Sequence, residues 1–236
     1  MRGEFTETAG LVVRLVDTGE SSRLVTLLTE KKGLIAVSAR GVRKGSKSFG
    51  GILEPMHRLV LTLEHAERDI ARLHEARVDA LRLAITGDLD ASLCAGYWLR
   101  FARSIAHPHG DDAALFRVVD GALDLLNESP PDHRRLEHLV PFAMLAAVGY
   151  SLELDQCISC GKACPPERSS AVDGRRGGLL CRTCGHAPMV ISGDLRHALR
   201  EAQGGVFVPL PNAQHRASAA SLAQEVVLQH VGRSIR

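Results

Sequence analysis

Residues 10–16 read Gly-Leu-Val-Val-Arg-Leu-Val, and residues 23–29 read Arg-Leu-Val-Thr-Leu-Leu-Thr. Both runs are rich in β-branched and aliphatic side chains, and Asp-Thr-Gly-Glu at residues 17–20 favours a turn between them. A second turn, Glu-Lys-Lys-Gly at residues 30–33, leads into a third run of the same kind at residues 34–40. The stretch therefore predicts three consecutive strands at hairpin spacing.

Two further segments extend this pattern. Residues 56–63 alternate in polarity and predict a fourth strand, while residues 69–77 are compatible with either a fifth strand or a helix. Five short strands within residues 1–80 favour a small closed barrel, because closure leaves no strand edge exposed.

Basic side chains are concentrated beside the predicted barrel. Residues 31–58 contain one acid, Glu54, and seven bases: Lys31, Lys32, Arg40, Arg43, Lys44, Lys47 and Arg58. The block is a candidate phosphate-binding surface, but a solvated face balanced by neighbouring acids explains it equally well. Phe49 lies in the Gly/Ser-rich loop at residues 41–51, and we expect it to anchor this loop on the barrel.

From about residue 88 the apolar spacing becomes helical. In the first expected helix, Leu89, Leu93, Tyr97, Arg100 and Phe101 form one candidate face. Pro141 should kink the third helix. The expected helices cover residues 88–105, 111–128, 132–149, 192–203 and 218–232.

Four cysteines form two pairs, Cys157 with Cys160 and Cys181 with Cys184. Each pair has a two-residue gap, and 20 residues separate the pairs, which is typical of tetrahedral zinc sites. Four thiolates leave no open position on the ion, so we predict one structural zinc. Two disulfides, or thiols that merely pack, are the alternative. Cys164 is the nearby rival ligand.

The stretch around the cysteine pairs is also basic. Arg175, Arg176 and Arg182 crowd it, while Glu167 and Asp173 offset part of the charge. Such a module can bind phosphates or dock another protein, and the sequence favours neither alternative.

Composition sets the remaining expectations. The chain has 236 residues, a net charge of +2 and 4% aromatic residues, and it contains no long apolar run. We therefore expect a cytoplasmic protein without a membrane segment. Motifs for phosphate loops, nucleophile elbows and zinc-protease helices are absent from the sequence, so we predict no catalytic residues and no small-molecule substrate.

The strand runs at residues 10–16, 19–29 and 33–44, followed by Leu-Glu-Pro at residues 53–55, resemble the N-terminal domain of the bacterial RecO recombination mediators. The order of the other parts also fits this family. The resemblance implies an α+β protein with an N-terminal OB-fold barrel and an all-α helical domain that carries an inserted four-cysteine zinc module. The expected boundaries are 1–80, 81–154, 155–187 and 188–236.

The resemblance also implies a function. Proteins of this family bind single- and double-stranded DNA, anneal complementary strands and, with RecR, help load RecA onto DNA coated by single-stranded-DNA-binding protein (SSB). They belong to the RecFOR repair pathway, act at the nucleoid and bind the acidic SSB tail. By position, the residues facing DNA would be Arg14, Arg23, Lys31, Lys32, Arg40, Arg43, Lys44 and Lys47. By charge, the candidates for the SSB tail are Arg100, Arg103, Arg134 and Arg135.

Two other functions compete with this expectation. One is a zinc-containing protein-interaction adaptor that does not bind DNA directly. The other is a metal-dependent enzyme acting on nucleic acids, which a filled zinc shell disfavours.

Overall fold

The computed structural model describes residues 5–18, 22–40, 49, 51–64, 70–108 and 110–232, without the side chains of Arg40, Arg134, His230 and Val231. The chain divides into two compact units, residues 1–131 and 132–236, and each is described by itself. The first unit contains the five predicted strands and the helices that follow them. The four-part division of the sequence stays a prediction.

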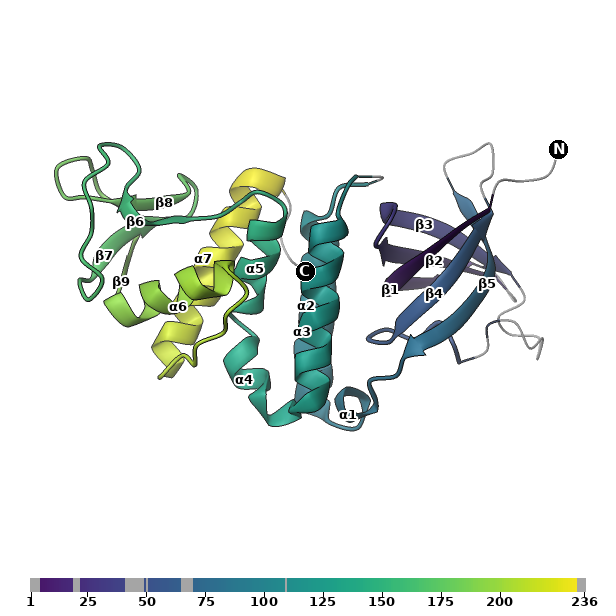
Figure 1. Cartoon of the computed structure of the whole chain (residues 1–236). Helices are drawn as coiled ribbons and strands as arrows, with labels where there is room; N and C mark the ends of the chain where they lie inside the picture. The colour runs from purple at the N-terminus through teal and green to yellow at the C-terminus, as the bar shows by residue number, and fades with distance from the viewer. Residues whose placement is uncertain are drawn as a thin grey trace. The chain divides into compact units, whose positions relative to one another are not determined.

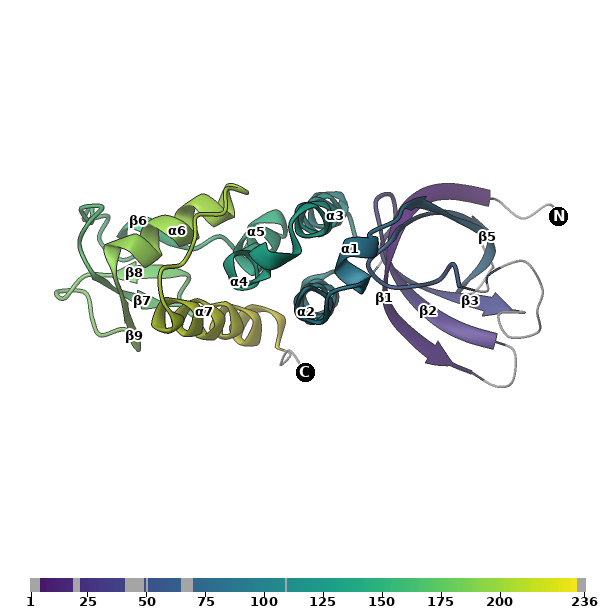
Figure 2. The same ribbon diagram turned by 90° about the horizontal axis from the view of Figure 1, so that it is seen from below.

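The first unit begins with a closed five-stranded barrel, which confirms the predicted OB-type architecture (Figures 1 and 2). The strand order around the barrel is β1-β2-β3-β5-β4, with β3 and β5 parallel where Val37 pairs with Ala71. The ambiguous segment at residues 69–77 is therefore a strand. The bounds are β1 (Phe5–Asp17), β2 (Ser22–Thr29), β3 (Gly33–Arg40), β4 (Arg58–Glu64) and β5 (Ala71–Ala80).

Strand β1 is shared between two neighbours and holds the barrel together. Gly10 pairs with Thr29 of β2 and with Leu59 of β4, and the register shifts between Val12 and Arg14. Such a bulge bends a strand, as closure requires. A Cβ on Gly10 would lie 2.6 Å from the Leu61 Cδ1 atom, so glycine lets the strands curve tightly here.

The barrel interior is filled by aliphatic side chains. Leu27, Leu61 and their neighbours are fully buried, and Phe49 packs in the same cluster with only 4% of its surface exposed. The expectation that Phe49 anchors its loop on the barrel is confirmed. Its ring is therefore not a platform for stacking bases.

Three helices complete the first unit: α1 (Leu83–Thr86), α2 (Leu89–Ile105) and α3 (Ala113–Glu128). Helices α2 and α3 both contact β1. The expected face of α2 is wrong at Leu89 and Leu93, which are 75% and 62% exposed, but its last member, Phe101, is buried. The buried face instead combines Trp98 with small side chains such as Ala91, which let the helix approach its neighbours closely.

The helices of the second unit differ from expectation at two points. Pro141 does not kink a continuous helix. The helix is interrupted before Val140, and Pro141 lies in the first turn of α5, where a backbone N–H group would have no partner within the helix. The last helix begins before Ser218, because the Asn212 side chain caps it by accepting from His215 N at 2.8 Å. A 3-10 turn, η1 (Pro130–Asp132), precedes the helices α4 (His133–Leu136), α5 (Val140–Ala147), α6 (Gly193–Gln203) and α7 (Ala213–Val231).

Between α5 and α6 lies a small sheet that the sequence did not predict. Its order is β6-β8-β7-β9, and Val172, Leu179 and Ile191 are buried in it. Strands this short carry too little alternation to be recognised. The bounds are β6 (Glu153–Cys157), β7 (Ser170–Asp173), β8 (Gly178–Leu180) and β9 (Met189–Ile191).

Across the described part of the chain, no helix combines the length and the hydropathy needed to cross a membrane.

Candidate metal centre and basic surfaces

The four paired cysteines converge at one end of the small sheet. Cys157 ends β6, and Cys181 directly follows β8. The sulfur atoms of Cys157, Cys160, Cys181 and Cys184 all lie within 4.8 Å of one another, and those of Cys160 and Cys181 are 3.7 Å apart. A tetrahedral ion with Zn–S bonds of 2.3 Å requires sulfur separations of about 3.8 Å. The cluster can therefore hold a metal ion and is consistent with zinc.

Backbone turns at each pair orient the thiols. The Gly161 amide donates to the Cys157 carbonyl at 2.9 Å, and Gly161 adopts a φ of +68°, which glycine tolerates without strain. In the second pair, the Cys184 amide donates to the Cys181 carbonyl at 3.0 Å. The Cys181 amide also donates to Cys157 Sγ at 3.4 Å, so one pair stabilises the sulfur of the other.

The thiols influence one another's ionisation strongly. Backbone amides, first that of Cys181, lower the pKa of Cys157. The Thr183 hydroxyl and then the Cys184 thiol lower the pKa of Cys181 to about 6. The thiols of Cys160 and Cys181 raise the pKa of Cys184 to about 12, because negative charge accumulates within the cluster. Four thiolates so close together need a cation between them, which fits the donor set of a divalent metal.

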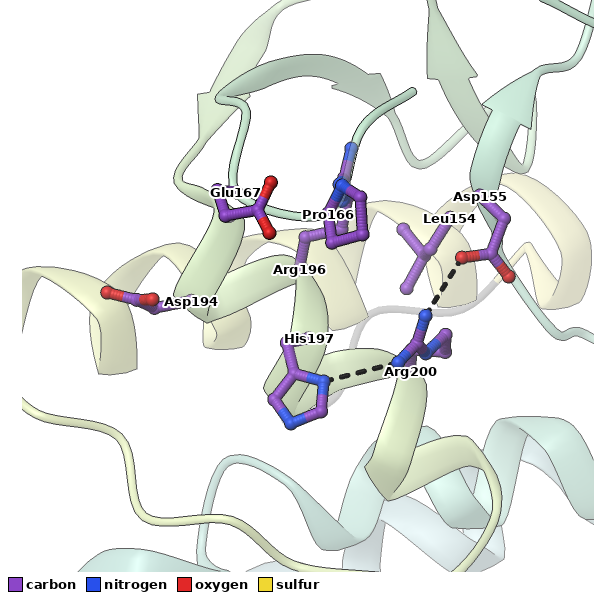
Figure 3. Close-up of a pocket in the computed structure, with 9 residues that line it drawn as sticks. Leu154, Asp155, Pro166, Glu167, Asp194, Arg196, His197 and Arg200 are labelled. Carbon is purple, nitrogen blue, oxygen red and sulfur yellow. Dashed lines mark hydrogen bonds and ion pairs between the residues drawn. The ribbon is translucent and has the colours of Figure 1, made fainter. Parts of the chain in front are cut away.

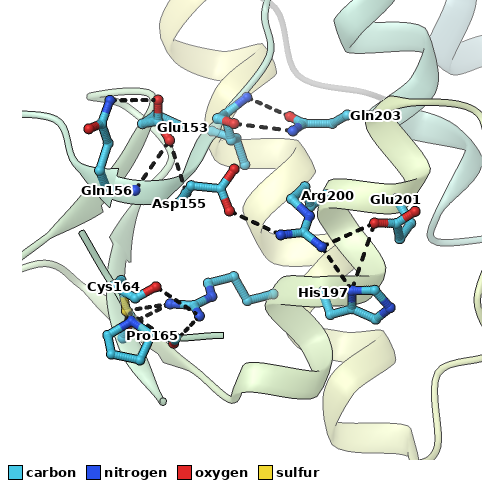
Figure 4. Close-up of polar contacts among 12 residues, drawn as sticks. Glu153, Asp155, Gln156, Cys164, Pro165, His197, Arg200, Glu201 and Gln203 are labelled. Atoms are coloured by element: carbon cyan, nitrogen blue, oxygen red, sulfur yellow. Dashed lines mark hydrogen bonds and ion pairs between the residues drawn. The ribbon is translucent and has the colours of Figure 1, made fainter. Parts of the chain in front are cut away.

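Cys164 lies outside the metal cluster, and Cys94 is buried in α2 as a core residue. The Cys164 sulfur contacts Ser170 Oγ at 2.6 Å and also the guanidinium of Arg196 on α6. Arg196 is 4% exposed and donates to the Pro165 carbonyl as well. Figure 4 shows Cys164 and Pro165 next to each other on the loop. The rival ligand therefore helps attach the loop between β6 and β7 to α6.

Further polar contacts tie the small sheet to α6. Arg200 pairs with Asp155 at 3.1 Å, and Asp155 is the largest cause of the raised pKa of Arg200. Gln203 exchanges two hydrogen bonds with the Leu152 backbone. Asp155 and Arg200 also line a cavity of about 190 Å³ that contains Glu167, Asp194 and His197 as well (Figure 3). Three carboxylates, two guanidinium groups and one imidazole line this cavity, so it carries no strong charge of one sign.

The three arginines predicted as a second contact surface occupy two places on the module. Arg175 and Arg176 lie in the turn between β7 and β8, where both amides donate to Asp173 Oδ1. The Arg176 side chain donates to Ser159 Oγ at 3.0 Å, beside the first cysteine pair. Arg182 is exposed between the two cysteines of the second pair.

Four predicted DNA-facing residues of the barrel are described with their side chains. Arg14, Lys31 and Lys32 are exposed. Lys31 Nζ donates to the Glu7 backbone carbonyl at 2.9 Å. Because a carbonyl group carries no net charge, this contact does not neutralise the positive charge of Lys31. Arg23 instead forms an ion pair with Asp17 at 2.8 Å across the β1–β2 ladder, so part of its charge is neutralised.

Four other predicted DNA-facing positions are not covered in full. The backbone of Arg40 ends β3, but its side chain lies outside the description. Arg43, Lys44 and Lys47 fall outside the described residues altogether. The assignment of these four residues stays a prediction.

The structure joins residues that the sequence analysis had assigned to different ligands. Burial, followed by the charges of Arg14 and Arg100, lowers the pKa of Arg103. Arg14 of β1 and the two α2 arginines therefore belong to one positive cluster. Among the described residues, no carboxylate forms an ion pair with any of the three arginines. Such a cluster attracts anions.

The other two candidates for the SSB tail lie in the second unit. Arg135 pairs with Asp132 at 2.9 Å within α4 and its preceding turn. The side chain of Arg134 is not described. The four candidate arginines thus belong to two different units.

The first unit contains a buried ionic network that was not predicted from the sequence. Arg82 is 1% exposed and pairs with Asp120 of α3 at 2.5 Å and with Asp124 at 2.8 Å. Arg58 of β4 also pairs with Asp120, at 2.7 Å, and this hydrogen bond is the main cause of its raised pKa. The partners are far apart in sequence, so no local spacing signals them. The block at residues 31–58 therefore contains one base with a structural role.

A closed five-stranded barrel, a helical region and a four-cysteine cluster define a class of two-part proteins related to nucleic-acid-binding OB folds. Comparison with known proteins identifies the family. A model described as recombination protein O N terminal matches residues 1–81, and one described as recombination protein O C terminal matches residues 86–236. The chain belongs to the RecO family of DNA repair proteins.

Similar proteins extend over nearly the whole chain. A DNA repair protein RecO of Anaeromyxobacter sp. (strain Fw109-5) is 33% identical and covers 98% of this chain and 93% of its own length. The protein of the same name from Myxococcus xanthus is 33% identical, with 96% and 92% covered. That of Geobacter metallireducens is 28% identical, with 98% and 95% covered.

Proposed function

We propose that this protein is a recombination mediator that binds single- and double-stranded DNA and anneals complementary strands. With RecR, it would help load RecA onto SSB-coated DNA, without catalysing a reaction itself. This activity would take place in the bacterial cytoplasm, at the nucleoid. Family membership supports the general role, and the unpaired positive charge on the barrel supports direct contact with DNA.

The single observation that carries DNA binding is the cluster of Arg14, Arg100 and Arg103. Arg14 lies on the barrel surface, and Lys31 and Lys32 add exposed charge at the β2–β3 turn. Phosphate contacts of this kind bind DNA without reading its sequence. The buried position of Phe49 agrees with this mode, because base stacking requires an exposed ring.

Annealing follows from the same electrostatics. Two complementary strands repel each other through their phosphates, and arginine or lysine side chains that neutralise these charges lower the repulsion. The bases then pair without nucleotide hydrolysis. Arg40, Arg43, Lys44 and Lys47 would extend the surface, while Arg23 would contribute less because Asp17 already pairs with it.

We also propose that Cys157, Cys160, Cys181 and Cys184 hold one zinc ion. The ion would supply cohesion rather than catalysis, since four protein ligands leave no position for a substrate. Arg100 and Arg103 remain our candidates for the acidic SSB tail, together with Arg134 and Arg135.

Charge reversal tests the DNA-binding proposal. The variant Arg14→Glu/Lys32→Glu should weaken binding of single-stranded DNA and reduce the dependence of log Kd on log salt concentration by about 0.7 for each lost phosphate contact. Arg43→Glu/Lys44→Glu/Lys47→Glu should do the same. The matched control is Arg117→Glu, an exposed position on α3 whose side chain donates to the Ala113 carbonyl and forms no ion pair among the described residues.

The measurement is an anisotropy titration at several salt concentrations. Unchanged affinity and unchanged salt dependence in both variants would contradict the proposed surface. Failure of the unmodified protein to bind DNA at all would favour the adaptor without DNA binding. Strand annealing with and without SSB then tests the mediator role directly.

A further inference from the structure

The small sheet of the second unit forms the floor of a groove. Ala171 of β7 pairs with Leu180 of β8 and with Val190 of β9, so the three side chains share one face of the sheet as an apolar row. Leu180 is buried, whereas Val190 is 69% exposed on the edge strand. The groove above this row has a volume of about 400 Å³ and lies within the second unit. The exposed apolar part of the floor is small, so the polar walls decide what the groove can bind.

The walls of the groove carry three basic side chains. Lys162 and Arg168 belong to the loop between β6 and β7, and Arg182 follows β8; all three line the groove and are exposed. In the described part of the chain, none of them forms an ion pair. Ser169 and Thr183 add hydroxyl groups to the same walls. Basic and hydroxyl side chains are the groups that contact phosphates in protein–DNA complexes.

The carboxylates of the same module point to other partners. Glu167 is exposed on the loop between β6 and β7, but it lines the separate cavity beside α6, as Figure 3 shows. Asp155 pairs with Arg200, and Asp173 accepts two amides of its own turn. Among the described residues, no carboxylate lines the groove itself.

The cysteine cluster holds two of the wall bases in place. Lys162 follows the first pair, and its carbonyl accepts from the Cys157 amide at 2.9 Å. Arg182 lies between the two cysteines of the second pair. A divalent ion would neutralise two of the four thiolate charges. Of the two cluster thiols that line the groove, Cys157 is buried and Cys181 is partly exposed, so a ligand meets the exposed bases before the sulfur atoms.

We infer that this groove is a second nucleic-acid site, which binds the phosphate backbone of a single DNA strand. Arg168 and Arg182 can each donate two hydrogen bonds to one phosphate group, and Lys162 supplies a further point charge. The inference rests on the proposed annealing function and extends it, because the barrel surface would hold one strand and the groove the complementary strand. It also decides between the two alternatives that the sequence left open for the module, in favour of phosphate.

The groove suits annealing because it offers no ring on which a base could stack. Among the described residues, no aromatic side chain lines it. Proteins that hold a strand through its bases rely on such rings. Contacts limited to the phosphates leave the base edges of the bound strand free to pair with a second strand.

The first test is an NMR titration of the full-length ¹⁵N-labelled protein with a short oligothymidylate. Saturable shifts should appear at the amides of Arg168, Ser169 and Arg182, and they should persist in Arg14→Glu/Lys32→Glu, which weakens the barrel surface. An abasic oligonucleotide of the same length should bind the groove within about twofold of the same affinity. Shifts confined to the barrel would overturn the inference and leave the proposed function intact. Absence of shifts in every region would contradict both.

Variants separate the groove from general charge effects. Arg168→Glu/Arg182→Glu should weaken binding at the groove at least tenfold, and so should Lys162→Glu/Arg168→Glu, which leaves the second cysteine pair untouched. Arg175→Glu, on the same module but outside the groove lining, is the matched control and should bind normally. Zinc content, measured on every sample, separates loss of a contact from loss of the fold. Normal binding by both groove variants would overturn the inference.

Stoichiometry and annealing connect the groove to the proposed function. The unmodified protein should bind two non-complementary strands per chain, and the groove variants should bind one. Annealing of complementary strands should be at least tenfold slower in the groove variants, although their barrel surface still binds DNA. One strand per chain in the unmodified protein, or full annealing rates in the variants, would contradict a second strand site. If an acidic peptide shifts the wall amides and DNA does not, the groove docks a protein and the inference is wrong.

Discussion

The barrel and the cysteine module both hold short strands together, but they use different physical means. The barrel buries a continuous aliphatic cluster that includes Leu27, Leu61 and Phe49. The module has strands of three to five residues, buries only a few apolar side chains such as Val172 and Leu179, and carries four thiols at one end. Apolar burial sustains the closed sheet of the barrel. The smaller sheet is held by polar contacts to α6, and we expect a metal ion on the four thiols to add to them.

The largest expected effect follows from disrupting the four-cysteine cluster. Cys181→Ser, or a strong chelator, should unfold the module, because structural zinc contributes about 10–16 kcal/mol in small zinc domains. The barrel unit should remain folded. Trp98 is the only tryptophan in the sequence and is buried in α2, so its fluorescence reports on the first unit alone. Hydrogen exchange of residues 153–191 reports on the module. Unchanged exchange after metal removal would contradict a structural ion.

The next effect concerns the ionic network of the first unit. Asp120→Asn should destabilise that unit by about 3 kcal/mol, because breaking a buried ion pair leaves Arg82 partly uncompensated. The value lies at the lower end of the usual range, since Asp124 still faces Arg82. Denaturant unfolding followed by Trp98 fluorescence measures the loss. Asp111→Asn, at an exposed position before α3, is the control and should change stability little.

Substitution of one glycine in each region tests how tightly the two sheets are packed. A Cβ on Gly178 of β8 would lie 2.5 Å from the Glu153 carbonyl oxygen, which belongs to the backbone and cannot move easily. On Gly10 the nearest atom is the end of the Leu61 side chain, which can change rotamer. Gly178→Ala should therefore cost more than Gly10→Ala, within the range of about 1–3 kcal/mol for overpacking. Equal losses, measured as exchange protection in each region, would contradict this ranking.

The smallest effect is a pH dependence at His57 in the first unit. Burial, followed by the charge of Arg82, lowers the pKa of His57, and its Nδ1 atom accepts from the Arg82 amide at 3.1 Å. The unfolded chain binds the proton more readily, so stability should fall as the pH drops through about 6.5 and below. One proton limits the slope to about 1.4 kcal/mol per pH unit. His57→Gln should flatten the dependence of Trp98-monitored unfolding on pH. If stability depends on pH in the same way in His57→Gln as in the unmodified protein, His57 is not the source of this dependence.

Some features of the candidate site could be predicted from the sequence, and the reason is local spacing. The cysteine pairs have a gap that brings two thiols to one ion, and the strands of the barrel carry enough residues to show alternation. Phe49 was predicted correctly to anchor its loop on the barrel, because an aromatic ring in a polar loop has few other structural roles. The face of α2 was predicted correctly at Phe101 but wrongly at its start, since Leu89 and Leu93 are exposed while alanines pack inside. Helical spacing alone does not tell which stripe faces the core.

By itself, the sequence determined four strands of the barrel, the convergence of four cysteines and the concentration of positive charge near the barrel, while it left the fifth strand open. Each depends on residues close together in the chain. The tertiary structure alone decided that Arg14 joins Arg100 and Arg103, that Arg82 is buried against Asp120, and that Leu180, Ala171 and Val190 form one apolar row. These groupings unite residues from separate segments of the chain, and only the packing of strands and helices brings them near one another.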